Sequence, residues 1–91
     1  MILVHYVYFL QSLKNPKQSY IGYSTNIENR LVTHNAGGSI HTVKYKPWEL
    51  IFYIAFKNAH EAKSFELYLK SPSGKAFALK RLLPGVKVIN E

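Results

Sequence analysis

The chain has 91 residues, which suits a single domain over residues 1–91 and favours a surface cleft over a deep cavity. It contains no cysteine, which excludes disulfides, zinc fingers and thiol nucleophiles. Twelve Lys and Arg residues stand against five Asp and Glu residues, so the formal net charge is +7. Such a charge serves either solubility or attraction to the phosphates of nucleic acid.

No apolar run reaches the roughly 18 residues that span a membrane, and the N-terminus lacks the pattern of a signal peptide. We therefore expect no membrane partner and a cytoplasmic location. The basic residues are dispersed, which indicates a basic face on a folded domain more than a basic tail. They include Lys14, Lys17, Arg30, Lys44, Lys46, Lys63, Lys70, Lys75, Lys80 and Arg81.

The first part of the chain predicts a hairpin followed by a helix. LVHYVYFL (3–10) is largely apolar on both alternating faces, which is typical of a buried central strand. A turn around Asn15-Pro16 and a second strand, QSYIGYS (18–24), complete an antiparallel hairpin. Thr25 stands three residues before Glu28, a capping-box spacing, and predicts a helix to about Asn35, which AGGS ends.

The second part of the chain predicts one more strand and two helices. WELIFYIAF (48–56) follows a loop with Pro47 and reads as the third strand. Asn58 predicts the start of a helix that ends before Pro72. The segment SGKAFALKRLL (73–83) predicts a short last helix, which Pro84-Gly85 ends. The order β-β-α-β-α-α predicts an α+β fold, a small three-stranded antiparallel sheet flanked by helices.

The first predicted helix places two functional side chains beside its apolar stripe. At about 100° per residue, Arg30 and His34 fall next to Ile27 and Leu31, one turn apart. Arg30 either lies along the margin with its head in water or holds its guanidinium over a cleft to contact phosphate. The helical pattern alone leaves both interpretations open.

Glu66 leans toward the apolar arc of the second predicted helix. An inward carboxylate is a candidate metal ligand, because hard divalent cations need oxygen ligands. The alternative is an i,i+4 ion pair with Lys70, worth a few tenths of a kcal/mol. The position alone favours the ion pair.

Other residues carry weaker signals. Tyr6 and Tyr8 share one face of the first strand, and Tyr20 precedes Gly22, a residue that leaves room for something to approach the sheet. Strand tyrosines usually pack with a wet hydroxyl. The segment 73–75, Ser-Gly-Lys, either holds a phosphate or is simply a helix start.

Taken together, these residues resemble the GIY-YIG nuclease domain, most closely its small stand-alone bacterial members. The resemblance covers nearly the whole chain, and its specificity lies in the ordered set and its spacing. The set is Tyr6-Val7-Tyr8, an interval of eleven residues, Tyr20-Ile21-Gly22, Arg30, His34 and Glu66. Many family nucleases also have an asparagine after the glutamate helix, whereas here none follows Pro72 until Asn90.

The resemblance implies a divalent-metal-dependent nuclease that hydrolyses phosphodiester bonds. Glu66 would hold one Mg²⁺ or Mn²⁺ ion, Arg30 would stabilise the developing charge, and Tyr8 or Tyr20 would activate water, helped by Arg30, the metal or His34. Gly22 would support the site. Nucleic-acid contacts are expected from Lys44, Lys46, Lys63, Lys70 and Lys75.

The expected partner is nucleic acid, DNA more than RNA, in a process such as DNA repair, and a homodimer is left open. Because no residues are left over for one, we expect no separate DNA-recognition domain, and the lack of cysteine argues against a zinc domain. Two alternative functions are kept beside the nuclease: a non-catalytic nucleic-acid-binding module and, with weaker support, a structural interaction protein. The missing asparagine favours the binding module, whereas Arg30, His34 and Glu66 favour the enzyme.

Overall fold

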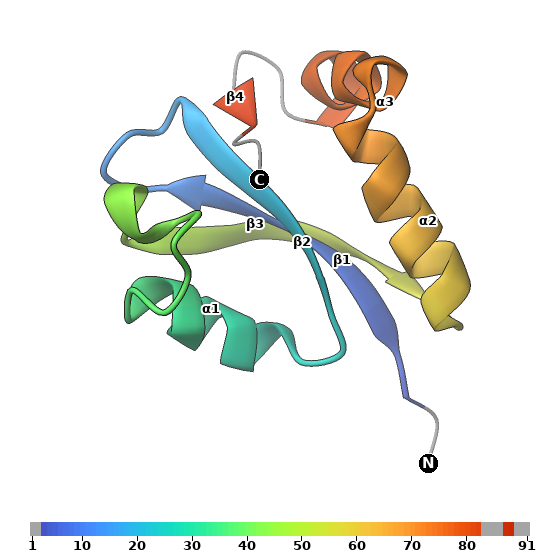
Figure 1. The fold of residues 1–91 in the computed structure, drawn as a ribbon, viewed down its shortest axis with the longest axis horizontal. Helices are drawn as coiled ribbons and strands as arrows, with labels where there is room; N and C mark the ends of the chain where they lie inside the picture. Colours follow the sequence, from blue (N-terminus) through green and yellow to red (C-terminus); the bar gives the residue numbers. More distant parts are fainter. Residues whose placement is uncertain (1–2, 83–86, 89–91) are drawn as a thin grey trace.

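The computed structural model describes residues 3–82 and 87–88, which form a sheet with helices on both faces (Figure 1). The strands are β1 (His5–Ser12), β2 (Gln18–Ser24), β3 (Trp48–Phe56) and β4 (Lys87–Val88), in the order β3-β1-β2-β4. β1 pairs antiparallel with both β2 and β3, which confirms the predicted sheet and its central first strand. β4, which pairs parallel with β2, is an addition that the sequence pattern does not predict.

The helices are α1 (Ile27–Asn35), α2 (Ala59–Lys70) and α3 (Pro72–Phe77). A 3-10 turn, η1 (Val43–Tyr45), precedes β3, and a π-helical turn, η2 (Ala78–Leu82), extends α3. The predicted end of the last helix, Pro84-Gly85, lies outside the described residues. Within the described residues, no helix has the length and apolar character to cross a membrane.

The two predicted helix starts have different outcomes. Asn58 caps α2, because its side chain accepts a hydrogen bond from the Glu61 amide, as predicted. The capping box with Thr25 is wrong by one residue: Asn26 is the N-cap of α1, and its side chain accepts from the Asn29 amide at 3.0 Å. The amide of Asn26 itself donates to the Ser24 hydroxyl at 2.8 Å, which fixes the turn one residue later.

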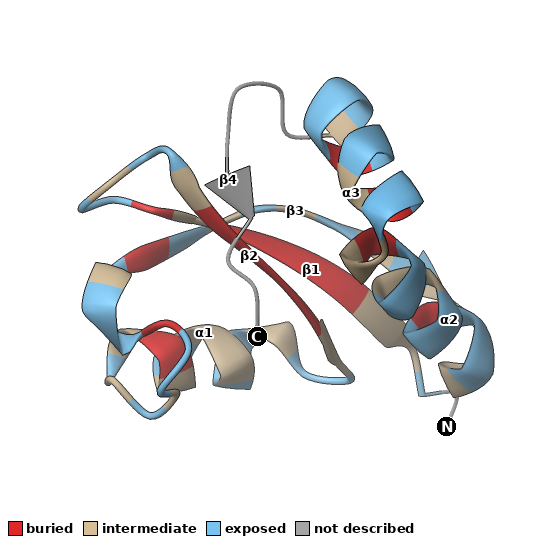
Figure 2. Ribbon diagram, turned by 45° about the horizontal axis from the view of Figure 1, so that its top comes forward, coloured by how far each residue is buried: buried red, intermediate tan, exposed pale blue. Residues whose placement is uncertain are grey.

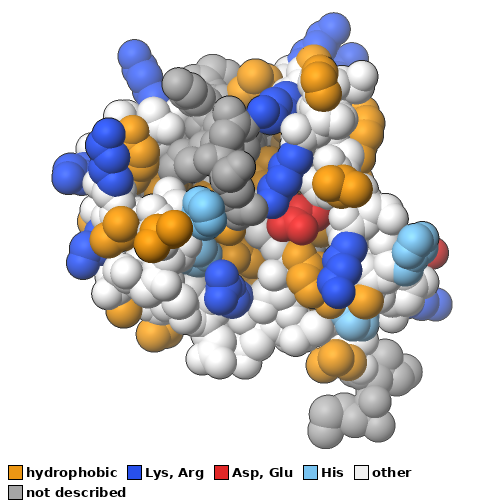
Figure 3. All heavy atoms as spheres, in the orientation of Figure 1, with side chains coloured by type: hydrophobic (Ala, Val, Ile, Leu, Met, Phe, Trp, Pro, Cys, Tyr) orange, Lys and Arg blue, Asp and Glu red, His pale blue; other side chains and the backbone are white. Residues whose placement is uncertain are grey.

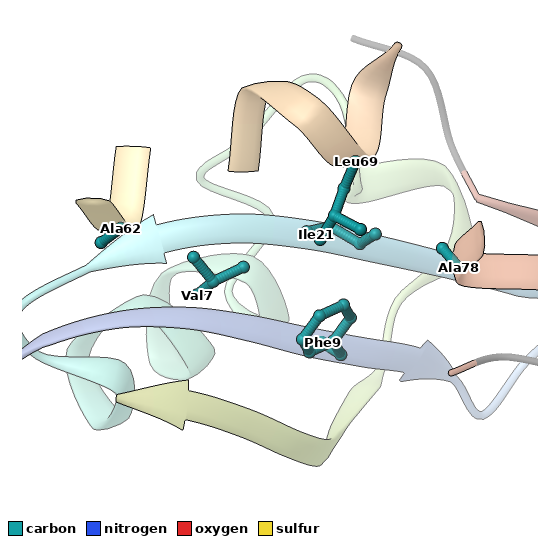
Figure 4. Close-up of a cluster of buried hydrophobic side chains, with 6 residues drawn as sticks. All are labelled: Val7, Phe9, Ile21, Ala62, Leu69 and Ala78. Atoms are coloured by element: carbon teal, nitrogen blue, oxygen red, sulfur yellow. The ribbon is translucent and has the colours of Figure 1, made fainter. Parts of the chain in front are cut away.

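Alternating side chains of β1 feed two separate hydrophobic cores, one on each face of the sheet. One face packs Val7, Phe9 and Ile21 against α2 and the turn after α3, through Ala62, Leu69 and Ala78 (Figure 4). The other face packs Tyr8, Leu10, Tyr20 and Trp48 beneath α1, with Ile27 and Leu31 from the helix. This double burial explains why β1 is apolar on both faces, and Figure 2 shows β1 buried over much of its length.

The strand β2 lies between α1 and α2, because these helices cover opposite faces of the sheet (Figure 1). Side chains of α1 pack with Tyr20 on one face of β2, and side chains of α2 pack with Ile21 on the other. The predicted site residues are distributed over these three elements and β1.

Candidate active site

A buried chain of hydrogen bonds links β1, α1 and the loop before β3. The Tyr8 hydroxyl lies 3.0 Å from Nε2 of His34, and Nδ1 of the same ring lies 2.7 Å from Oγ1 of Thr42. His34 and Thr42 are 0 % exposed and Tyr8 is 1 % exposed. The prediction that His34 borders the packed face is therefore corrected: the ring lies inside the core.

Tyr20 completes an aromatic group around His34. Its ring centroid is 4.8 Å from that of His34 and 6.3 Å from that of Tyr8. Tyr20 reaches this place because it sits on the same face of β2 as Gly22, the cross-strand partner of Tyr8. The structure thus brings together three of the predicted residues, Tyr8, Tyr20 and His34.

Gly22 has a specific steric role beneath this group. A Cβ at this position would overlap the hydroxyl and ring of Tyr8. The glycine was expected to leave room for something to approach the sheet, and the structure shows that this is the ring of Tyr8 itself. Gly22 therefore sets the position of the tyrosine hydroxyl.

Three residues that the sequence reasoning missed hold the histidine in place. The indole Nε1–H of Trp48 donates to the Thr42 carbonyl at 2.9 Å. The Asn35 side chain bonds both backbone groups of Trp48, accepting from its amide at 2.5 Å and donating to its carbonyl at 3.0 Å. Thr42, Trp48 and Asn35 thus join the end of α1 to the start of β3. Of these three residues, only Asn35, at the end of α1, and Trp48, at the start of β3, stand at positions that the sequence marks, and this signal is weak.

The two hydroxyls that bond His34 are compatible with either neutral tautomer, because a hydroxyl both donates and accepts. With the ring proton on Nε2, Thr42 donates to Nδ1 and the ring donates to the Tyr8 oxygen. With the ring proton on Nδ1, Tyr8 donates to Nε2 and the ring donates to Thr42.

Arg30 lies on α1 one turn before His34 and is half-buried. This position agrees with the predicted margin of the apolar stripe formed by Ile27 and Leu31, both of which pack on the core. The guanidinium is fixed in charge and carries a planar fork of donors.

Glu66 comes from α2, on the opposite side of β2 from α1. Its side chain is 20 % exposed and forms an ion pair with Lys70, Oε2 to Nζ, at 3.4 Å. The ion pair that the position favours is thus present. Among the described residues, no group of three or more His, Cys, Asp or Glu could hold a metal ion.

The five lysines predicted to bind nucleic acid divide between the two sides of the molecule. Lys44 and Lys46 are exposed around η1, and Lys44 Nζ lies 5.4 Å from the centre of the Tyr45 ring. Lys63 and Lys70 lie on α2 and Lys75 on α3, with Lys63 Nζ 5.2 Å from the centre of the Tyr23 ring. Figure 3 shows the face of the molecule that is turned to the viewer in Figure 1: basic side chains lie along both of its sides and an acidic side chain lies near its middle.

The segment Ser73-Gly74-Lys75 is a helix start with a packing role. The amide of Gly74 donates to Oγ of Ser71, the N-cap of α3, at 3.2 Å. A Cβ on Gly74 would overlap the carbonyl of Tyr68 at the end of α2. The glycine is therefore explained by the close joint between α2 and α3, which supports the helix-start interpretation.

The site can supply the groups that cleavage of a phosphodiester requires. It has a tyrosine hydroxyl bonded to a histidine, a guanidinium on the helix of that histidine and a half-buried carboxylate on α2, across the sheet. These can activate water, neutralise charge on phosphate and bind a hard cation. These chemical groups are of the kinds that hydrolysis of a phosphodiester uses.

Comparison with known proteins identifies the family. The model of the GIY-YIG catalytic domain family matches residues 4–80, and the chain belongs to this family. It is 38 % identical over 68 residues to a UPF0213 protein of Staphylococcus haemolyticus, a match covering 74 % of this chain and 80 % of that protein. The solution NMR structure of the UPF0213 protein BH0048 from Bacillus halodurans has a TM-score of 0.50 and 28 % identity, covering 89 % of this chain and 87 % of that one.

A eukaryotic relative carries a functional name. The chain is 38 % identical over 73 residues to the structure-specific endonuclease subunit SLX1 of Debaryomyces hansenii. That match covers 72 % of this chain and 21 % of the yeast protein. The match therefore leaves most of that protein uncompared.

Proposed function

We propose that this chain is a divalent-metal-dependent nuclease that hydrolyses phosphodiester bonds in nucleic acid, with DNA as the preferred substrate. The observation that carries the proposal is the buried hydrogen bond between Tyr8 and His34, one helical turn from Arg30. Membership of the GIY-YIG catalytic domain family and the similarity to an endonuclease subunit support it.

Tyr8 is the proposed general base. The proposal places the proton of His34 on Nε2, with Thr42 donating to Nδ1. In this tautomer the histidine donates a hydrogen bond that stabilises negative charge on the Tyr8 oxygen and cannot itself take the tyrosine proton. Tyr8 is 1 % exposed, so attacking water reaches its hydroxyl only after the groups over it move. Tyr20 packs on His34 and limits the ring's rotation.

Arg30 and Glu66 are proposed to act on the phosphate from the two sides of β2. Arg30 stabilises the charge that builds on the phosphate oxygens in the transition state. Glu66 would hold the single Mg²⁺ or Mn²⁺ ion, which fits the preference of Mg²⁺ for one or two carboxylates completed by water and substrate phosphate. When bound, such an ion polarises a phosphate oxygen and stabilises the leaving oxygen.

A second candidate function is a nucleic-acid-binding module that does not cleave. Two observations favour it: Glu66 is paired with Lys70, and no asparagine occurs from Ser73 to Leu82. An ion would have to displace Lys70 from the carboxylate. The buried tyrosine–histidine pair argues for chemistry, since binding alone does not need it.

Cleavage of labelled oligonucleotides decides between the two functions. We expect nicking with Mg²⁺ or Mn²⁺, none with EDTA, and loss of nicking in Glu66→Gln, because the amide is a poor ligand for a hard cation. Binding should be retained or improved, since a negative charge facing phosphate is removed. Gel-based cleavage and fluorescence anisotropy measure the two quantities.

Glu61→Gln is the matched control. Glu61 is exposed in the first turn of the same helix, so its variant should cut at the wild-type rate. A Glu66→Gln variant with full activity, or a Glu61→Gln variant equally inactive, would contradict the assignment. Binding without metal-dependent cleavage in wild type would select the binding module.

A further inference from the structure

A pocket separate from the tyrosine–histidine pair opens beside the start of α1. Its volume is about 320 Å³, within the size range of small-ligand pockets. It is lined by Tyr6, Leu50 and Tyr53 from the sheet and by the segment 25–28 from the beginning of α1. Aromatic, aliphatic and polar side chains therefore meet in one concave place.

Tyr53 offers a flat aromatic surface to this pocket. Its side chain is 51 % exposed, yet Tyr6 meets it edge to face, with ring centroids 5.2 Å apart and planes at 87°. Singly exposed apolar side chains need no explanation. Here the edge contact holds an exposed ring at the rim of a pocket, an arrangement suited to stacking a second flat ring.

Glu28 gives the pocket its polarity. The chain carries a net charge of +7, and within the described residues no lysine, arginine or histidine pairs with this carboxylate. A carboxylate near the helix N-terminus is also favoured by the helix dipole. It repels phosphate, however, and accepts hydrogen bonds from amino groups such as N4 of cytosine. The pocket is therefore suited to a base and unsuited to a phosphate.

Two links connect the pocket to the proposed catalytic residues. Tyr53 is the cross-strand partner of Tyr8 in the β1–β3 pairing. Ile27, in the pocket wall, is three residues from Arg30 on α1, a spacing that makes them neighbours on the helix surface. A nucleotide whose phosphate is bound by Arg30 would therefore lie close to the pocket.

We propose that this pocket receives one unpaired nucleobase of the substrate, stacked on Tyr53 and hydrogen-bonded to Glu28. This inference rests on the proposed nuclease function and narrows its substrate to nucleic acid with an unpaired nucleotide. A base inside a duplex is stacked and paired, so its face is closed to Tyr53. Bases with an exocyclic amine (cytosine, adenine and guanine) should be preferred to thymine.

Anisotropy binding of fluorescein-labelled DNA to the Glu66→Gln full-length chain tests the pocket. The probes are a fully paired duplex and the same duplex with one unpaired cytosine or thymine. Tyr53→Ala, in the Glu66→Gln chain, should weaken binding of the unpaired-cytosine probe by about 10-fold, the scale of one lost base–aromatic stack, and leave the duplex within about 2-fold. Tyr53→Phe should bind like the parent chain.

The matched control is Tyr68→Ala, since Tyr68 is an exposed tyrosine on α2, away from the pocket lining. Glu28→Gln should reduce the preference for cytosine over thymine, because an amide can also donate. Equal losses on both probes, or equal effects of Tyr53→Ala and Tyr68→Ala, would overturn the pocket assignment. Wild type that neither binds nor cuts any probe would instead overturn the proposed function.

Discussion

A single substitution at Arg30 can separate a role in catalysis from a role in attracting the phosphates of nucleic acid. Arg30→Lys keeps the charge and loses the planar fork of donors. If Arg30 stabilises the transition state, single-turnover cleavage at saturating substrate should fall by about 10²-fold or more, by analogy with the loss of a preorganised donor. Affinity should change by only a few-fold, because other basic residues share the binding.

The control for this substitution is the chain's other arginine. Arg81 is exposed in η2, and Arg81→Lys should leave both rate and affinity near those of wild type. A cleavage rate for Arg30→Lys within a few-fold of wild type would favour the binding module.

Thr42 offers a second test, of the histidine tautomer. Thr42→Val keeps the volume and removes the hydroxyl that is hydrogen-bonded to Nδ1 of His34, as its donor in the proposed tautomer. We expect the cleavage rate to fall by about 10-fold or more, since a positioned proton-transfer group contributes 10²–10⁴-fold. Thr42→Ser should restore most of the rate.

A purely structural role for Thr42 would give a different pattern. The ¹⁵N chemical shifts of the His34 ring distinguish the two tautomers, so they should change in Thr42→Val and stay in Thr42→Ser. Unchanged ring shifts in Thr42→Val would contradict the tautomer assignment whatever the thermal stability of the variant.

At this scale the sequence predicts residues on regular elements better than residues in loops. Helical spacing placed Arg30 at the margin of the apolar stripe, where it lies, but placed His34 there too, although its ring is inside the core. The family pattern added Tyr8 and Tyr20. Thr42 lies in a segment with no periodic pattern, and its role depends on the indole of Trp48 donating to its carbonyl. Such a contact arises only when the chain is folded.

Among the elements, the joint between α2 and α3 is the most sensitive to a single atom. A Cβ on Gly74 would meet the backbone carbonyl of Tyr68, which has no flexible end to move aside. Gly74→Ala should therefore lower the free energy of unfolding by about 2 kcal/mol, as overpacking does, and Tm by about 10 °C. Differential scanning calorimetry measures both.

Ser73→Ala controls for the change in this helix. Ser73 is exposed in the same turn, and the effect of its substitution should stay within about 0.5 kcal/mol. A Gly74→Ala chain as stable as wild type would show that the two helices can separate at little cost.

The elements themselves follow closely from local pattern. The three long strands and the starts of α1 and α2 are predicted within a residue or two, because alternation, helix spacing and caps extend over several residues. The cap of α1 is misplaced because Thr25 and Asn26 are both good cap residues and the Ser24 hydroxyl decides between them. β4, only two residues long, is too short to leave a pattern.

For the whole molecule, the net charge of +7 predicts a steep dependence of binding on salt. If the five predicted lysines each neutralise one phosphate of duplex DNA, the log–log slope should be about 4 to 5, at roughly 0.9 per contact. Binding titrations between 50 and 200 mM salt give the slope (roughly a fourfold range, enough to resolve it). The binding constant of the wild-type chain is measured at every salt concentration.

Single lysines refine this test. Lys63→Gln should lower the slope by about one unit, whereas Lys17→Gln, in the turn between β1 and β2, should leave it unchanged. A flat salt response would assign the charge to solubility. The homodimer and the cytoplasmic location stay predictions at this scale.

The steric relation between Gly22 and Tyr8 has a consequence for how the family's sequences can change. The two triplets that mark this domain are separated along the chain, but here the last residue of one occupies the space that the last residue of the other leaves empty. A side chain gained at position 22 would displace the hydroxyl that His34 holds. In evolutionary terms the two positions should be inherited as a pair: descendants that lose the glycine should also have replaced the tyrosine, and with it the proposed general base.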